Sequence, residues 1–429
     1  MIRIKKFVPV LLSLFIALSA YGQDLEYAKR VVKDLSSPAF GGRGYVDNGL
    51  DKAAKYIKKQ YAEIGVKPFG NDYYQPFRLD VNTFPSTLKL AIDGTELIPG
   101  EEYLVHPTSP SLKGTYAVSV IRKDELLNEN TVKACVESLA GKVLIVDETD
   151  FTIEDKEEIK KINEKMIFLR TDPTVPSAAT IIYSATRPIW SVGRRQGPKP
   201  VFMVKKDLDL KNIRKVDINI KAKFVDHETR NVIGYIEGKS KPDSFLVVTA
   251  HYDHLGKMGK KAIFPGANDN ATGVAMMLNF AKYFAANPSE YSVVFMALSA
   301  EEAGIVGAKY CAEHPMLALD KIKFLINFDM AGTGDEGITV VNGTVFQKEF
   351  NLLEKLNEDG GYLSAVKVRG ESCNSDHCPF YQKGVPSFFI YTNGGSQPYH
   401  DIRDVYDTLP FSGFEGYTKL MIDFFNNVR

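Results

Sequence analysis

Three apolar runs in the second half of the chain predict buried strands. They cover residues 247–250, 293–298 and 324–328, and the segments between them, Thr272 to Phe284 and Gly304 to Cys311, have helical spacing. An alternation of strands and helices predicts a largely parallel α/β sheet. Ligands of such a sheet bind beyond the carboxyl ends of its strands. The residues that follow each run are therefore candidates for a functional site.

Histidine and acidic residues follow these three runs. His251 follows the first run, Glu301 and Glu302 follow the second, and Asp329 follows the third. Asp269 belongs to the loop between the first strand and its helix. Because the carboxyl ends of neighbouring parallel strands meet at one edge of the sheet, these four blocks predict a single site.

The first half of the chain has a different pattern, in which short alternating runs predict a β-rich unit with a helix or two. We predict that residues 83–227 form an inserted β-rich domain. The surrounding residues 23–82 and 228–429 then form one discontinuous α/β domain, with a mostly parallel, mixed central sheet flanked by helices. Two consecutive domains, with residues 24–80 in the first, are the alternative.

Composition and charge are those of an ordinary globular protein. The chain has 429 residues, of which 44% are hydrophobic and 25% are charged, so it can bury a sizeable core. Lys and Arg together number 53, as do Asp and Glu, which gives a formal net charge of zero. This balance gives no attraction to nucleic acid or to an anionic membrane, and we expect no nucleic-acid partner.

The N-terminus has the pattern of a secretory signal peptide, assigned to residues 1–22. Basic residues precede the apolar run 7–18, and residues 20–22 have the small-x-small pattern of a cleavage site. The run is short for a membrane span, and an uncleaved anchor is the alternative. We expect a secreted or periplasmic protein without stable membrane insertion, whose mature chain begins near Gln23.

Four cysteines are too few for a disulfide framework in an exported protein of this size, so the core has to stabilise the fold. Cys373 and Cys378 are close enough in sequence to bridge. Because export favours oxidation, we predict a disulfide between them.

The acids and histidines of the predicted site are the donors that a pair of zinc ions requires. Imidazole nitrogens and carboxylate oxygens bind zinc, usually with three protein ligands for each ion and one position for water. Five ligands serve two ions if one carboxylate bridges them. His400 is the natural fifth member, because it follows a predicted strand from Ser387 to Tyr391. The predicted ligands are His251, Asp269, Glu302, Asp329 and His400.

Two further acids have roles beside the ligands. Glu301 adjoins Glu302, so one carboxylate can bind metal while its neighbour acts as general base. Asp253, two residues after His251, suits a role in fixing the tautomer of that imidazole. We expect His254, in contrast, to be structural or to lie at the surface.

Four segments carry these acids and histidines except His400: AHYDH, GANDNATG, ALSAEEAG and INFDMAG. Together with the loop SSPAFGGRG and the segment NVIGYIEG, they resemble the exported co-catalytic zinc aminopeptidases, the family that also holds the glutamate carboxypeptidases. The resemblance extends over residues 24–429 and implies that the insertion is a protease-associated domain. It also implies that Asp269 bridges the two zinc ions and that the Asp269–Asn270 peptide bond is cis. The acid-threonine pair of the family is here Asp404 and Val405, a departure that touches no predicted ligand.

The resemblance implies a role for the other residues of the site as well. His251 and Asp329 would hold one zinc ion, Glu302 and His400 would hold the other, and Glu301 would be the general base. The function that follows is a metallo-exopeptidase with two zinc ions per chain. We expect an aminopeptidase that hydrolyses N-terminal residues from peptides.

Three alternatives accompany this interpretation: a carboxypeptidase or dipeptidase of the same family, a single-zinc enzyme like the glutaminyl cyclases, and a non-catalytic receptor-like module. The glutaminyl cyclases are interrupted after the glutamate pair, whereas residues 301–308 are uninterrupted here. Intact ligands and an intact base oppose the non-catalytic module. The sequence leaves the side-chain preference, the role of the insertion and the oligomeric state open.

Overall fold

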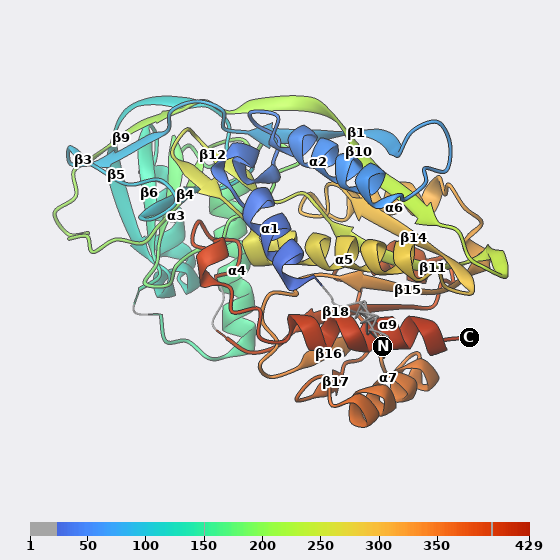
Figure 1. Ribbon diagram of the computed structural model, residues 1–429. Coiled ribbons are helices and arrows are strands. Elements are labelled where there is room, and N and C mark those ends of the chain that lie inside the picture. Colours follow the sequence, from blue (N-terminus) through green and yellow to red (C-terminus); the bar gives the residue numbers. More distant parts are fainter. Residues whose placement is uncertain (1–23, 150, 396–397) are drawn as a thin grey trace, which may run out of the picture.

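The computed structural model describes residues 24–149, 151–395 and 398–429. The expected signal peptide and the expected start of the mature chain lie outside the described residues. Two eight-stranded sheets dominate the fold, and helices pack against both (Figure 1). Among the described residues, no helix combines the length and the apolar character that a membrane span requires.

The first sheet is mixed and has a parallel centre. From one edge to the other it consists of β1 (Tyr74–Thr83), β10 (Lys223–Ile236), β14 (Tyr291–Leu298), β11 (Lys241–His251), β15 (Ile322–Phe328), β18 (Ser387–Thr392), β16 (Ile338–Val341) and β17 (Val366–Val368). The four strands β14, β11, β15 and β18 pair in parallel. β1, β10 and β16 join them by antiparallel pairing, and β17 extends the edge in parallel. The predicted α/β class with a mostly parallel, mixed sheet is confirmed.

Helices cover both faces of the first sheet, which explains why its central strands are apolar throughout. Val248 of β11 belongs to the core on one face, and Val247 belongs to the core on the other. The helices on the Val248 face are α1 (Leu25–Leu35), α2 (Gly49–Ile64), α5 (Thr272–Ala286), α7 (Gln347–Gly360) and α9 (Phe414–Asn427). Those on the Val247 face are α6 (Val306–Glu313) and α8 (His377–Gln382).

The second sheet is formed by strands that lie between β1 and β10 in the sequence. In order across the sheet they are β3 (Thr95–Glu96), β2 (Lys89–Ile92), β9 (Lys215–Ile220), β5 (Leu112–Arg122), β6 (Lys142–Asp147), β7 (Ala179–Tyr183), β8 (Val201–Val204) and β4 (Tyr103–Val105). The helices α3 (Glu129–Glu137) and α4 (Lys156–Thr171) pack on one of its faces. The domain boundaries at residues 83 and 227 stay a prediction.

A small hairpin connects the two sheets. Its strands β12 (Gly256–Met258) and β13 (Ala262–Phe264) follow β11 closely in the sequence. Met258 and Phe264 are buried in the same core as the strands of the second sheet. The carboxyl end of β11 therefore lies where the first sheet meets the second.

Candidate metal centre

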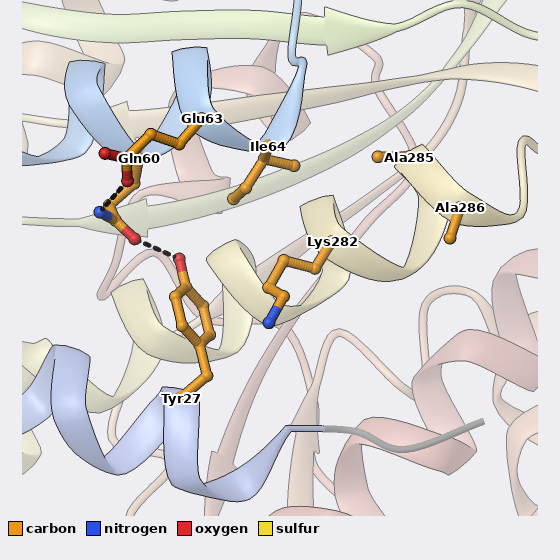
Figure 2. A pocket seen from close by; sticks show the side chains of 7 residues that line it. All are labelled: Tyr27, Gln60, Glu63, Ile64, Lys282, Ala285 and Ala286. Atoms are coloured by element: carbon orange, nitrogen blue, oxygen red, sulfur yellow. Dashed lines mark hydrogen bonds between the residues drawn. The ribbon is translucent and has the colours of Figure 1, made fainter. Parts of the chain in front are cut away.

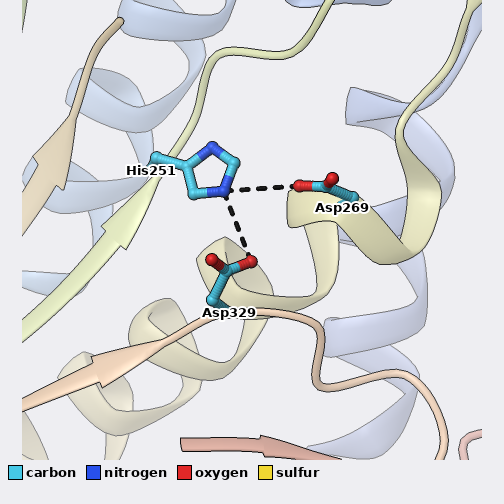
Figure 3. A group of neighbouring side chains, drawn as sticks. All are labelled: His251, Asp269 and Asp329. Atoms are coloured by element: carbon cyan, nitrogen blue, oxygen red, sulfur yellow. Dashed lines mark hydrogen bonds and ion pairs between the residues drawn. The ribbon is translucent and has the colours of Figure 1, made fainter. Parts of the chain in front are cut away.

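Strand ends of the first sheet bring the first group of predicted ligands together. His251 is the last residue of β11, and Asp329 directly follows β15. His251 Nε2 lies 3.3 Å from Asp329 Oδ1 and 3.4 Å from Asp269 Oδ1, and the three side chains point toward one another (Figure 3). Their ligand atoms all lie within 4.8 Å of one another. These residues therefore form one compact group of possible metal ligands.

A second group of predicted ligands lies on the other side of Asp269. His400 Nε2 is 3.0 Å from Glu302 Oε2 and 3.3 Å from Asp269 Oδ2. Asp269 thus presents Oδ1 to His251 and Oδ2 to His400. This is the arrangement in which one carboxylate can bridge two ions, and it brings all five predicted ligands together.

Residues outside the loop that carries Asp269 fix its conformation. The Asp269–Asn270 peptide bond is cis, as the resemblance implied. The Asp404 carboxylate accepts hydrogen bonds from the main-chain N–H groups of Asn268, at 2.8 Å, and of Asp269, at 3.1 Å. Gly266 has φ 60°, and a Cβ there would lie 2.2 Å from the main-chain oxygen of Asp269, so the loop requires glycine. The direction of the Asp269 side chain is therefore fixed by its surroundings.

Arg43 is a buried residue of the site that the sequence analysis did not single out. Among the described residues, its guanidinium donates hydrogen bonds to main-chain carbonyl oxygens, those of Leu35, Tyr252, Pro265, Gly266 and Asp269. Burial lowers its pKa to about 10, although nearby carboxylates oppose that shift. Arg43 thus connects the early glycine-rich loop to the loop that carries Asp269 by hydrogen bonds. The two glycines before Arg43 were the only feature of the sequence that could have drawn attention to it. The sequence does not reveal the five carbonyl oxygens that accept its hydrogen bonds.

Asp253 links His251 to the glutamate pair. Its buried carboxylate accepts hydrogen bonds from the main-chain N–H groups of Glu301, at 3.1 Å, and of Glu302, at 3.2 Å. His251 Nδ1 lies 3.2 Å from the main-chain oxygen of Asp253 and 3.7 Å from its carboxylate. Burial raises the pKa of Asp253 to about 6. Asp253 therefore positions the main chain of both glutamates relative to the His251 ring.

The surroundings of the two adjacent glutamates push their pKa values in opposite directions. Burial, with Asp376 and other carboxylates, holds the pKa of Glu301 well above its ordinary value despite the opposing effect of His251. Burial and Asp269 also act to raise the pKa of Glu302, but His400 and His254 outweigh them and lower it to about 2. Neighbouring carboxyl groups with separated pKa values suit different roles, one as proton carrier and one as ionised ligand.

His254 is the second functional candidate that the sequence analysis missed. Its side chain is fully buried, which excludes the surface position and leaves the structural role as the other expectation. His254 Nδ1 lies 2.7 Å from Glu302 Oε1 and 4.0 Å from Asp269 Oδ1, and the three residues form a further possible ligand group. Nothing in the sequence separates His254 from an ordinary histidine, because only the turn after β11 brings it to Glu302.

The predicted disulfide between Cys373 and Cys378 is present. It closes the short segment that contains Ser375, whose hydroxyl donates a hydrogen bond to Asp329 Oδ2 at 2.9 Å. Asn327 donates in turn to the Ser375 hydroxyl oxygen at 2.8 Å. The disulfide therefore belongs to the segment that orients the predicted ligand Asp329.

The donor set and the charge of the site both fit divalent cations. The side chains of Asp253, Asp269 and Asp376 are buried, and the Asp376 carboxylate has no hydrogen-bond partner among the described residues. The buried guanidinium of Arg43 is directed at carbonyl oxygens. Buried carboxylates without counter-charge are costly, so this cluster favours cations. Imidazole and carboxylate donors are those that zinc prefers.

A separate hollow is lined by residues of α1, α2 and α5 (Figure 2). Its lining consists of Tyr27, Gln60, Glu63, Ile64, Lys282, Ala285 and Ala286. The Tyr27 hydroxyl donates a hydrogen bond to Gln60 Oε1 at 2.6 Å. The predicted site residues are not among the residues that line this hollow.

Comparison with known proteins connects this geometry to one family. Residues 231–425 match peptidase family M28. A curated relative, aminopeptidase YwaD of Bacillus subtilis strain 168, is 27% identical over 257 residues, which cover 58% of this chain and 52% of the relative. The alignment thus spans about half the length of that relative.

Solved structures with a similar fold include two bacterial aminopeptidases. The zinc aminopeptidase BSAP of Bacillus subtilis has a TM-score of 0.68 and 20% identity, with 93% of each chain covered. The aminopeptidase of Aneurinibacillus sp. strain AM-1 has a TM-score of 0.62 and 19% identity, with 95% of this chain and 94% of the other covered. At these identities the likeness establishes the fold, which extends over almost the whole chain.

Proposed function

We propose, from the match of residues 231–425 to peptidase family M28, that the chain is a zinc-dependent aminopeptidase that removes N-terminal residues from peptides. The observation that carries the proposal is the Asp269 carboxylate, which faces His251 with one oxygen and His400 with the other. A carboxylate placed between two sets of nitrogen and oxygen donors is what a pair of zinc ions requires.

Each ion would have its own ligands beside the shared one. His251 and Asp329 would hold the first ion with Asp269, and Glu302 and His400 would hold the second. When bound, the zinc ions would polarise the scissile carbonyl group and make a water molecule more acidic. The proposal is therefore two zinc ions per chain.

Glu301 would move the protons of the reaction. A carboxylate whose pKa is raised accepts a proton from water more readily and can return it to the leaving amine. The pKa of Glu301 is raised by burial and by the acids around it. The Asp253 carboxylate holds the main-chain N–H of Glu301, which fixes the position from which this side chain acts. Glu301 is proposed as the general base and Asp253 as its positioning residue.

Aminopeptidase activity is supported over the carboxypeptidase alternative by the curated relative YwaD, which is named an aminopeptidase.

The glutaminyl cyclase alternative is not favoured. The glutamate pair leads through an uninterrupted turn into α6, and the five predicted ligands could serve two ions instead of one. A non-catalytic module is disfavoured too, because Glu301 is present beside a complete ligand set. The choice between these classes therefore rests on the second ligand group and on the base.

Export to the periplasm or the outside of the cell is part of the proposal. The pattern of residues 1–22 supports it, and so does the disulfide between Cys373 and Cys378, since disulfides persist in oxidising compartments. Fractionation of cells that express the full chain tests this. Recovery of the chain in the cytoplasm with residues 1–22 still attached contradicts it.

Zinc analysis combined with matched substrates tests the activity. The protein is loaded with zinc, its metal content is measured by mass spectrometry, and aminoacyl p-nitroanilides are compared with their N-acetylated forms. We expect two zinc ions per chain, hydrolysis of the free aminoacyl compounds and none of the acetylated ones. Equal rates for both forms would refute the need for a free amino end. One zinc ion and no hydrolysis would point to the cyclase alternative.

A further inference from the structure

The metal ligand His400 is held by a residue of the second sheet. His400 Nδ1 donates a hydrogen bond to the main-chain oxygen of Trp190 at 2.8 Å, although the two residues are 210 positions apart. The main-chain N–H of Trp190 donates in return to the main-chain oxygen of His400 at 3.3 Å. A ring nitrogen that donates to a carbonyl oxygen leaves the other nitrogen free to bind metal, and it fixes the direction of the ring.

Trp190 is itself anchored firmly. It lies in the connection between β7 and β8, and only 5% of it is exposed. Its indole Nε1 donates to the main-chain oxygen of Val105 in β4 at 2.8 Å, and its ring stacks on Phe264 of β13 with 4.7 Å between centroids. The carbonyl oxygen that receives His400 is thus fixed by contacts with the second sheet and with the connecting hairpin.

The residues after His400 are attached to the same region. Arg187, three positions before Trp190, pairs with the Asp401 carboxylate at 2.5 Å and also donates to the main-chain oxygen of Gly100 at 2.9 Å. Ile402 packs against the core that the second sheet shares with the hairpin. Three consecutive residues from His400 onward therefore rest on segments that precede β10.

We propose that the segment from Arg187 to Trp190 is a positioning element for the metal ligand His400, so that the second sheet controls zinc retention at the ion held by Glu302 and His400. The inference rests on the proposed function, because it assumes that His400 binds zinc. It gives the β-rich part of the chain a direct task at the metal centre. Neither His251 nor Asp329, the proposed ligands of the other ion, hydrogen-bonds to Trp190 or Arg187 among the described residues.

The test measures how fast each zinc ion leaves the loaded full-length protein when a chelator is added. Arg187→Gln removes the charge that links Asp401 to the second sheet, and Arg187 is partly exposed, so this variant should fold. Loss of contacts behind a metal ligand typically weakens metal binding ~10- to 100-fold. We expect one zinc ion to leave ~10-fold faster or more in this variant, while the other leaves at the unchanged rate. Trp190→Phe, which keeps a stacked ring but loses the bond to Val105, should act in the same direction.

Arg403→Gln is the matched control. Arg403 also pairs with the Asp401 carboxylate, at 3.0 Å, but it lies two positions away in the same segment and is not part of the second sheet. Equal acceleration of zinc release by Arg403→Gln and Arg187→Gln would overturn the inference. Zinc release would then depend on any ion pair of Asp401 and not on its link to the second sheet. Unchanged zinc release in both Arg187→Gln and Trp190→Phe would overturn it as well.

His400→Ala separates this inference from the proposed function. If His400→Ala retains both zinc ions, the ligand assignment itself is wrong. If His400→Ala loses one ion while Arg187→Gln releases both at the normal rate, the ligand assignment stands and only the positioning role fails. In the His400→Ala background, Arg187→Gln should leave the release of the remaining ion unchanged, because the element acts through His400.

Discussion

The His254 ring donates from Nδ1 to Glu302 Oε1 at 2.7 Å, while the other carboxylate oxygen of Glu302 faces His400. The carboxylate is thus held from two sides by imidazoles. His254 is fully buried, and its Nε2 has no hydrogen-bond partner among the described residues. Groups that hydrogen-bond a metal-binding carboxylate fix its direction and strengthen metal binding.

This contact predicts different effects for two substitutions of His254. An asparagine amide can place an N–H donor close to the position of Nδ1, whereas leucine cannot donate. We expect His254→Asn to retain most of the zinc held by Glu302, and His254→Leu to weaken its binding ~10- to 100-fold. Calorimetric titration of the metal-free variants with zinc measures this affinity. Equal affinity in the leucine variant and the unaltered protein contradicts the role.

Asp269 and His400 are expected to differ in the number of zinc ions that depend on them. Asp269 faces both ligand groups, and His400 faces one. Asp269→Asn should therefore lower the occupancy of both sites, because an amide is a poorer zinc ligand than a carboxylate. His400→Ala should mainly affect one. Metal analysis of the two proteins after dialysis compares them, and two fully retained ions in the Asp269 variant would exclude a bridging role.

The disulfide between Cys373 and Cys378 is expected to add only modest stability. The two residues are five positions apart, and closing a loop of this length constrains the unfolded chain less than the roughly 3 kcal/mol expected for a 15-residue loop. The double variant Cys373→Ser, Cys378→Ser should therefore fold, with a free energy of unfolding lower by less than this amount. Urea denaturation measures the difference. Mass spectrometry of the exported protein should find both thiols oxidised, and free thiols there would refute the bond.

His106, in the second sheet's region, predicts a loss of stability in acid. Burial, with Arg170 and Arg195, lowers the pKa of His106 from 6.5 to about 4. The main-chain N–H of Thr108 donates to His106 Nδ1 at 3.3 Å, which suits the neutral ring. Between these two pKa values the unfolded chain binds a proton that the folded chain does not. The contribution of the neutral His106 ring to the free energy of unfolding is fully present above about pH 6.5 and is lost as the pH falls toward 4.

His106→Asn should accordingly flatten the acid limb of the stability curve. The substitution removes the titrating ring, so the change in urea midpoint between about pH 7 and about pH 5 should be smaller than in the unaltered chain. Part of the acid loss should persist, because burial also lowers the pKa of His377 to about 4. An identical or steeper acid limb in the variant would show that His106 does not titrate on unfolding.

The sequence predicted the parts of the site that follow strands of regular pattern. His251 and Asp329 could be placed because apolar runs reveal buried strands, and the ends of parallel strands share one edge. Asp269 and Glu302 were predicted as ligands by the same reasoning, and only the bridging role of Asp269 came from the family resemblance. These predictions rest on apolar runs and on the residues that directly follow them, and both can be recognised in a single sequence.

Contacts between distant segments could not be predicted in this way. Arg43 reaches carbonyl oxygens that lie more than two hundred positions later, with a separation of 209 to Tyr252 and 226 to Asp269. Trp190 meets His400 through its main chain, and main-chain groups carry no signature in the sequence. Sequence patterns therefore predicted which side chains gather at the site, but not the residues that position them.

The last prediction concerns the adjacent glutamates. If Glu301 is the general base, Glu301→Gln keeps the shape of the side chain but cannot accept a proton from water. General acid-base catalysis contributes about 10²- to 10⁴-fold, so kcat should fall by at least that range while KM changes little. Zinc content should stay at two ions. Glu302→Gln should instead lose metal as well as rate, because its carboxylate faces His400 and an amide binds zinc less well. Zinc loss in the Glu301 variant and retention in the Glu302 variant would reverse the two roles, and unchanged hydrolysis in both would place the catalytic site elsewhere.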